Sequence, residues 1–271
     1  MTRLRLEVTS PVPVEADSLS PDRLAGLSHD QVRSLPLYHG NKTRTVGDFF
    51  QLEGEGSETL EIEGDLSRFK KLGMGMTRGS LTLRGSVGLH LGAEMEGGTI
   101  EVFGDASDWV GAEMKGGLIH VHGNAGNRPG AGYRGSEVGM KGGTILVDGN
   151  AGLEVGAFMR RGLIVVGGDA GDFAGALMIA GSIFVLGRLG ARAGASMRRG
   201  TLLTLHPIEP LPTFRDAGTH RFPFLRLYFE SLRRRGLAVP EGLERSSFRR
   251  YVGDMIELGL GEILVREREG Q

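Results

Sequence analysis

Hydrophobic positions recur with a fixed period through the middle of this chain. Each unit opens with residues that alternate, apolar at the first and third positions, and a Gly follows the fourth. Alternation with a period of two predicts a strand with one buried face, and equal strands at equal steps predict stacked repeats. The clearest units open at residues 81–85, 100–104, 119–123, 145–149, 164–168 and 183–187, at steps of 19, 19, 26, 19 and 19 residues, and a degenerate unit at 60–64 precedes them.

The end of each unit is equally regular, because a Met stands three residues before a Gly. A coil this short encloses a narrow core, and the flexible Met side chain is suited to its irregular gaps. We therefore expect one buried column of methionines along the stack. The pairs are Met95/Gly98, Met114/Gly117, Met140/Gly143, Met159/Gly162, Met178/Gly181 and Met197/Gly200, with Met76/Gly79 in the degenerate unit.

No stretch inside a unit is long enough for a helix, and the leucine-rich repeat pattern is absent. We predict an all-β fold: a right-handed parallel β-helix of about seven coils, each adding roughly 4.8 Å. Open strand edges at both ends of such a stack need covers. We expect a short N-terminal cap at 1–59, 19-residue coils at 60–201, and a helical C-terminal cap at 202–271 with a helix from about Pro223 to Arg235.

The outward-facing second positions change character along the stack. They are polar in the first half and apolar in the second, and an apolar stripe needs a cover. Either the C-terminal helix folds back over it or a partner subunit packs there, and both can hold. These positions are Thr82, Glu101, His120, Leu146, Val165 and Phe184.

Composition removes several classes of function. The formal net charge of −1 gives no reason to expect nucleic acid or an anionic membrane as partner. The absence of Cys excludes disulfides, Cys-ligated zinc, thiol catalysis and iron–sulfur clusters held by this chain. No apolar run has membrane length, so we expect a cytoplasmic protein.

Two motifs carry possible chemistry. His120 and His122 share a strand face, with Glu101 and Asp148 expected beside them, so a divalent metal could bind. We favour a solvated polar ladder and assign no metal, cofactor or catalytic residue to this chain. The G-x-G-x-x-G at 130–135 does not lead from a strand into a helix, which argues against a dinucleotide site.

Seven extra residues enlarge one repeat, around residues 127–138. An enlarged loop in a regular array is a common place for function. Arg128, Tyr133 and Arg134 suit an anion or a partner's carboxylate. The alternative is a tolerated surface insertion.

Basic residues follow the Met positions. Stacking would align them into a ridge along much of the rod, which is solvated, docks an acidic partner or holds an extended polyanion. The ridge residues are Lys115, Lys141, Arg160, Arg161, Arg198 and Arg199.

Glycines at fixed places in each unit, such as Gly104, Gly111 and Gly117, resemble the GXGXG β-helix domain. That domain occurs in glutamate synthase and as the C subunit of formylmethanofuran dehydrogenase. The stretch 45–50, Thr-Val-Gly-Asp-Phe-Phe, and the tail 250–263, Arg-Tyr-Val-Gly-Asp-Met-Ile-Glu-Leu-Gly-Leu-Gly-Glu-Ile, resemble the second.

The resemblance implies a non-catalytic subunit in a complex that handles a methanofuran-type carrier with a glutamate-rich tail. The expected partners are a formyltransferase subunit, an amidohydrolase-like subunit and a dehydrogenase-B-like subunit. A bacterial formyltransferase/hydrolase complex is our first choice, and an archaeal molybdenum or tungsten dehydrogenase complex is the alternative. A stand-alone metal-dependent enzyme and a glutamate synthase domain remain further alternatives.

Overall fold

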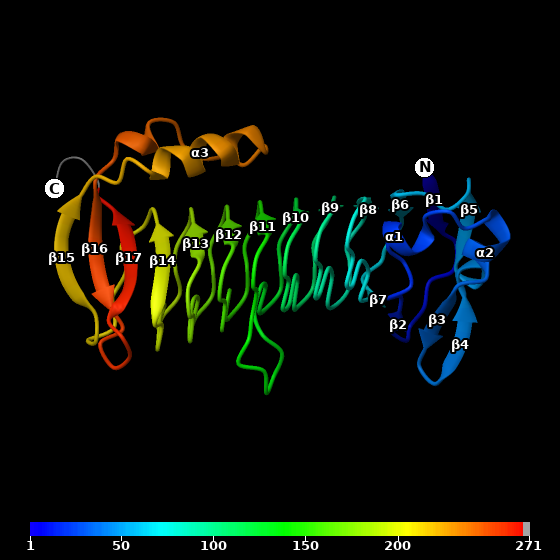
Figure 1. The fold of residues 1–271 in the computed structure, drawn as a ribbon, viewed down its shortest axis with the longest axis horizontal. Helices are drawn as coiled ribbons and strands as arrows, with labels where there is room; N and C mark the ends of the chain where they lie inside the picture. The colour runs from blue at the N-terminus through cyan, green and yellow to red at the C-terminus, as the bar shows by residue number, and fades with distance from the viewer. Residues whose placement is uncertain (268–271) are drawn as a thin grey trace.

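The computed structural model describes residues 1–267, which form an elongated rod of stacked strands (Figure 1). One strand from each repeat lies parallel to the next, with equivalent residues opposite each other: Ile119 pairs with Ile100 on one side and Ile145 on the other. This confirms the all-β fold and its parallel stack. The stacked strands are β6 (Thr59–Glu63), β8 (Ser80–Arg84), β9 (Thr99–Val102), β10 (Leu118–Val121), β11 (Thr144–Val147), β12 (Leu163–Val166), β13 (Ser182–Val185) and β14 (Arg199–Thr204).

The Met column is confirmed, since every Met of the repeats is fully buried. The structure also explains its pairing with Gly. A Cβ atom added to Gly117 would lie 2.7 Å from the methyl carbon of Met95, and one added to Gly181 would lie 2.9 Å from that of Met159. Each Met methyl therefore fills space that the Gly of the next coil leaves open.

Short polar side chains at one corner of the coils supply hydrogen bonds that the strands do not. The Oδ1 atom of Asp105 accepts from the backbone N–H of Asn124 at 2.7 Å. The Oδ1 atom of Asn124 accepts from the backbone N–H of Asn150 at 2.9 Å, and the Oδ1 atom of Asn150 accepts from the backbone N–H of Asp169 at 2.8 Å. The ladder satisfies backbone donors that would otherwise lack partners at the turn.

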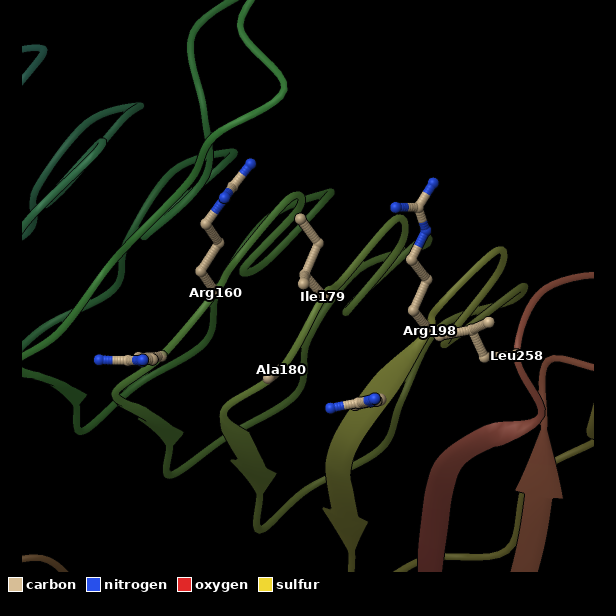
Figure 2. Close-up of a pocket in the computed structure, with 7 residues that line it drawn as sticks. Arg160, Ile179, Ala180, Arg198 and Leu258 are labelled. Atoms are coloured by element: carbon tan, nitrogen blue, oxygen red, sulfur yellow. The ribbon is translucent and has the colours of Figure 1, made fainter.

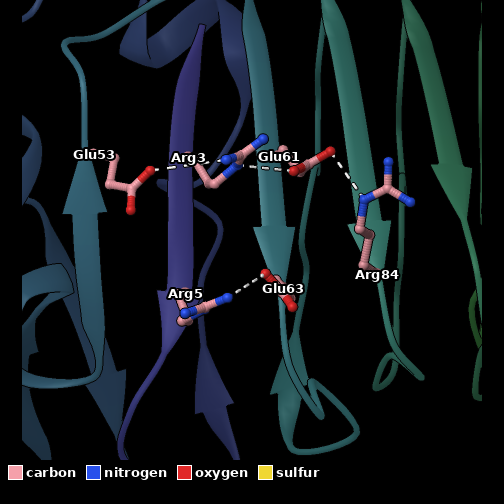
Figure 3. Close-up of polar contacts among 6 residues, drawn as sticks. All are labelled: Arg3, Arg5, Glu53, Glu61, Glu63 and Arg84. Atoms are coloured by element: carbon pink, nitrogen blue, oxygen red, sulfur yellow. Dashed lines mark hydrogen bonds and ion pairs between the residues drawn. The ribbon is translucent and has the colours of Figure 1, made fainter.

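At the N-terminal end, β1 (Thr2–Leu6) pairs in parallel with β6 and antiparallel with β5 (Phe50–Glu53). Side chains of alternating charge form ion pairs across these strands (Figure 3): Arg3 lies 2.9 Å from Glu61, which lies 3.0 Å from Arg84. A small second sheet and short helices complete this end: β2 (Val14–Glu15), β3 (Pro36–His39), β4 (Lys42–Thr45), β7 (Phe69–Lys70), α1 (Pro21–Leu24), α2 (His29–Arg33) and the 3-10 turn η1 (Val46–Asp48).

The C-terminal segment contains a helix and three strands. The helix α3 (Leu225–Arg234) lies within the stretch predicted to be helical. The strands were not predicted: β17 (Leu260–Arg266) pairs in parallel with β14, and β16 (Phe248–Gly253) and β15 (Arg215–His220) extend the sheet antiparallel. The 3-10 turn η2 (Leu243–Arg245) follows α3. None of the described helices has the length and apolar character needed to span a membrane.

Helix α3 lies over the apolar half of the outer sheet face (Figure 1). Leu146, Val165 and Phe184 are buried there in one cluster with residues of α3. The ring of Phe229 on α3 lies 6.3 Å from that of Phe184. The stripe is therefore covered by the chain's own helix, the first of the two predicted covers.

Candidate functional site

The basic residues after the Met positions do align between coils. The backbone N–H of Lys141 donates to Met114 at 2.7 Å, and those of Arg160 and Arg198 donate to Met140 and Met178 at 2.8 Å. The column of basic residues is interrupted, however. Ile179 and Ala180 occupy the equivalent places between the two arginine pairs, and Glu96 stands in the same column before Lys115.

The interruption leaves a hollow between the two arginine pairs. Its volume is about 400 Å³. Arg160 and Arg198 stand on either side of Ile179, and Leu258 lies next to Arg198 (Figure 2). Four guanidinium groups therefore surround a small apolar floor. The lining residues are Arg160, Arg161, Ile179, Ala180, Arg198, Arg199 and Leu258.

Only part of this positive charge is neutralised within the chain. Arg198 forms an ion pair with Glu257 at 3.1 Å. Within residues 1–267, Arg160, Arg161 and Arg199 form no ion pair. The hollow therefore keeps a positive potential that an anion with several charges can satisfy.

The loop between β16 and β17 forms one wall. The carboxylate of Asp254 is buried, and its Oδ2 atom accepts from the backbone N–H of Ser196 at 3.0 Å. This contact holds the loop against the last coil, which places Glu257 and Leu258 beside the arginines. The tail stretch 250–263 thus contributes to the hollow, which its sequence did not indicate.

A second, smaller hollow of about 150 Å³ adjoins the first through Arg160 and Arg198. Phe158, Leu177 and Ile179 line it, with Glu137 from the enlarged repeat and Glu257 from the tail. Its mixed carboxylate and apolar lining contrasts with the first hollow. The four-arginine hollow is therefore the stronger candidate for an anion.

The enlarged repeat projects from the side of the rod between β10 and β11 (Figure 1). Arg128 does not reach out of it: its guanidinium pairs with Glu154 at 3.2 Å and lies over the ring of Trp109. Burial and the nearby carboxylates of Glu94 and Glu113 raise the pKa of Tyr133 to about 12, so its phenol stays neutral. Of the three predicted insertion residues, Arg134 alone is exposed, whereas Arg128 and Tyr133 are half-buried.

The histidine pair lies on β10 and just after it. Glu101 is opposite His120, as predicted. His120 Nε2 and His122 Nδ1 each lie 2.8 Å from an oxygen of Asp148. A solvated ladder is wrong for His120, because only 4% of this residue is exposed.

The chain matches the family model described as the GXGXG motif over residues 61–211. Over 98% of its length it is 49% identical to the C subunit of the formyltransferase/hydrolase complex Fhc of Methylorubrum extorquens, of which 99% is covered. The chain belongs to the GXGXG motif family. A search of solved structures gives a similar result: a chain of the Methylorubrum extorquens formyltransferase/hydrolase complex with methylofuran matches with a TM-score of 0.92 and 38% identity, over 98% of this chain and 100% of that one.

Relatives from Methanothermobacter match over a shorter stretch. The chain is 45% identical over 83 residues to the C subunit of the molybdenum-containing formylmethanofuran dehydrogenase 1 of Methanothermobacter marburgensis. That match covers 30% of this chain and 21% of the relative. The C subunit of the tungsten-containing formylmethanofuran dehydrogenase 2 of Methanothermobacter wolfeii is 41% identical over 87 residues, or 32% of that relative. The chain thus spans only a fifth to a third of these archaeal relatives.

Proposed function

We propose that this chain is the non-catalytic C subunit of a cytoplasmic formyltransferase/hydrolase complex. Such a complex transfers a formyl group to a methanofuran-type carrier and releases it as formate. The observation that carries the proposal is the similarity to the Fhc C subunit over nearly the whole of both chains. A formyltransferase subunit, an amidohydrolase-like subunit and a dehydrogenase-B-like subunit would be its partners.

An archaeal-type dehydrogenase complex is the second candidate. The matches to those C subunits favour it, but they cover only 30% of this chain. The bacterial complex has the stronger support because its C subunit matches 98% of the chain, both caps included.

In this role the chain would serve as a rigid support. We take residues 60–201 as a right-handed parallel β-helix of about seven coils, with caps at 1–59 and 202–271. Crossovers between parallel strands of one sheet are right-handed in nearly all proteins. A rod of this kind fixes the distance between whatever binds along it.

We further propose that the four-arginine hollow holds the glutamate-rich tail of the carrier. Arg160 and Arg161 stand two coils, or roughly 10 Å, from Arg198 and Arg199. An extended chain of carboxylates can therefore engage both pairs, since each guanidinium binds carboxylates through paired N–H donors. Ile179 and Ala180 between them offer an apolar floor for the methylene groups of the tail.

Other predicted candidates fit this role less well. Lys115 is engaged by Glu96 at 2.6 Å, and this hydrogen bond raises the pKa of Lys115. Arg128 is held by Glu154 inside the molecule. Lys141, one coil before Arg160, and the exposed Arg134 remain as extensions of the track, with Tyr133 next to Arg134 in the enlarged repeat.

The test is steady-state kinetics of the assembled complex with a long-tailed carrier and with a tail-less analogue. Replacing Arg160 and Arg161 by Glu should raise the KM for the long-tailed carrier roughly 3- to 30-fold, since each lost pair contributes about 0.2–1 kcal/mol and repulsion is added. Added salt should weaken the wild-type preference for the long tail.

The matched control is the double variant Arg68→Glu, Arg188→Glu, which makes the same change in net charge at exposed residues elsewhere. It should leave both KM values unchanged. An equal effect of the Arg160 and Arg161 substitutions on both substrates, or no effect on either, would show that the hollow does not hold the tail.

A further inference from the structure

The pair His120 and His122 lies between two carboxylates that come from opposite sides. Glu101 on β9 faces His120, while Asp148, just after β11, approaches both rings from the next coil. The two imidazole centroids are 4.0 Å apart. Four side chains of metal-binding types, from three consecutive coils, thus meet at one place. None of them lines the arginine hollow.

Asp148 engages one nitrogen of each ring and leaves the other free. Its two oxygens accept from Nε2–H of His120 and Nδ1–H of His122, each at 2.8 Å. A donated ring N–H fixes the tautomer of a histidine and leaves a lone pair on the opposite nitrogen. Carboxylates hold metal-binding histidines in this way in many proteins.

Glu101 and the two histidines bring their ligand atoms close together. One ligand atom each from Glu101, His120 and His122 lies within 4.8 Å of the others. Within residues 1–267, Glu101 forms no ion pair or side-chain hydrogen bond that would compete for its carboxylate. A small inward movement of these side chains would bring all three to coordination distance.

Charge and burial favour a cation at this place. Two carboxylates face the two imidazoles, and Asp148 engages one nitrogen of each ring. The basic group of the neighbouring strands, Arg84, is directed to Glu61 at 3.0 Å and lies over the ring of Phe103. Phe103 in turn stacks on His122, with centroids 4.6 Å apart, and limits the movement of that ring.

We propose that Glu101, His120 and His122 bind one divalent transition-metal ion, with Asp148 as the positioning residue for both imidazoles. Two nitrogens and one carboxylate oxygen form a ligand set typical of zinc and related ions. Three protein ligands leave a coordination position for water, on the side where His122 remains partly exposed. The ion would join β9 to β10 where the polar half of the outer face meets the half covered by α3.

The test uses the full chain, stripped with a chelator and titrated calorimetrically with zinc alone. One ion should bind per chain. Glu101→Gln and His122→Ala should each weaken binding at least 10-fold, and Asp148→Asn should weaken it about 10- to 100-fold, the range typical of such positioning residues. The cobalt(II) form should show visible absorption bands that change in each variant.

The control is His220→Ala, because His220 is an exposed histidine on β15 whose Nε2 lies 2.8 Å from the carbonyl oxygen of Ala217. It should bind zinc like the wild type. Circular dichroism would establish that each variant is folded, and Glu101→Gln changes no buried side chain. Absence of binding by the wild type at millimolar zinc, or binding that Glu101→Gln and His122→Ala leave unchanged, would overturn the proposal. Neither result depends on the carrier or on a partner subunit.

Discussion

Replacing Met159 by Ala should destabilise the rod, and the loss should depend on Gly181 in the next coil. Met159 is fully buried, and its methyl carbon lies 2.9 Å from where a Cβ on Gly181 would stand. Loss of a buried Met side chain costs about 2–5 kcal/mol when the surroundings cannot collapse, and stacked coils hold the walls of this space apart. The single variant should fall in this range.

The substitution Gly181→Ala tests the same contact from the other side. An added Cβ overpacks the site, which costs about 1–3 kcal/mol, and the φ angle of 112° at Gly181 adds backbone strain. In the Met159→Ala background the overpacking disappears but the strain remains. The double variant should therefore be more stable than the sum of the single effects predicts, by about 1–3 kcal/mol.

Urea unfolding followed by circular dichroism measures all four free energies of unfolding. The backbone strain cancels in the double-mutant cycle, so the coupling reports the Met–Gly contact alone. A loss well under 1 kcal/mol in Met159→Ala, or effects that add within about 0.5 kcal/mol, would refute the interlocked columns.

Two further predictions concern the helix and the enlarged repeat. Phe229→Ala should lower the free energy of unfolding in urea by about 3–5 kcal/mol, because it uncovers Phe184. Leu227→Ala, at a residue that is 70% exposed, should change it by no more than about 0.5 kcal/mol. Equal effects of the two substitutions would contradict the packing of α3 on the sheet. Burial raises the pKa of Tyr133 from an ordinary value of about 10 to about 12, so the folded state binds the phenol proton more tightly than the unfolded state does. The stability that this proton contributes is complete below about pH 10 and is lost as the pH rises toward 12. Unfolding midpoints at about pH 9 and about pH 11 should therefore differ less in Tyr133→Phe than in the wild type, and an unchanged difference would be evidence against a raised pKa of this half-buried phenol.

The repeat itself could be predicted because each coil places the same residue type at the same point. The period and the Met positions were sufficient to predict the strand register and the buried column. The partners of the non-repetitive segments could not be inferred in this way. β17 follows β14 after a long excursion of the chain and still pairs with it in parallel, and no local pattern encodes that contact.

The candidate site was predicted in part. The repeat period predicts the alignment of the arginines after the Met positions, but the hollow also depends on Ile179 and Ala180, which occupy the same step in the coil between them. The orientation of the Arg128 side chain depends on Glu154 and Trp109 in neighbouring coils. Its charge alone therefore does not predict that it turns inward. The burial of His120 depends on what lies above the sheet, and strand alternation reports only which face a residue occupies.

The enlarged repeat is closed at its base by a backbone hydrogen bond to the Met, like the one that closes the regular coils. The backbone N–H of Met140 returns to the carbonyl of Gly130 at 2.9 Å, just as that of Met159 bonds to Gly156 at 3.0 Å in a coil without extra residues. The strands on either side consequently keep their register whatever length of chain emerges between these two points. Evolution can therefore change the exposed tip at Arg134 and Gly135, and protein engineers can graft a foreign peptide there, as long as Tyr133 keeps its contact with Glu113 and Glu137 its place in the second hollow.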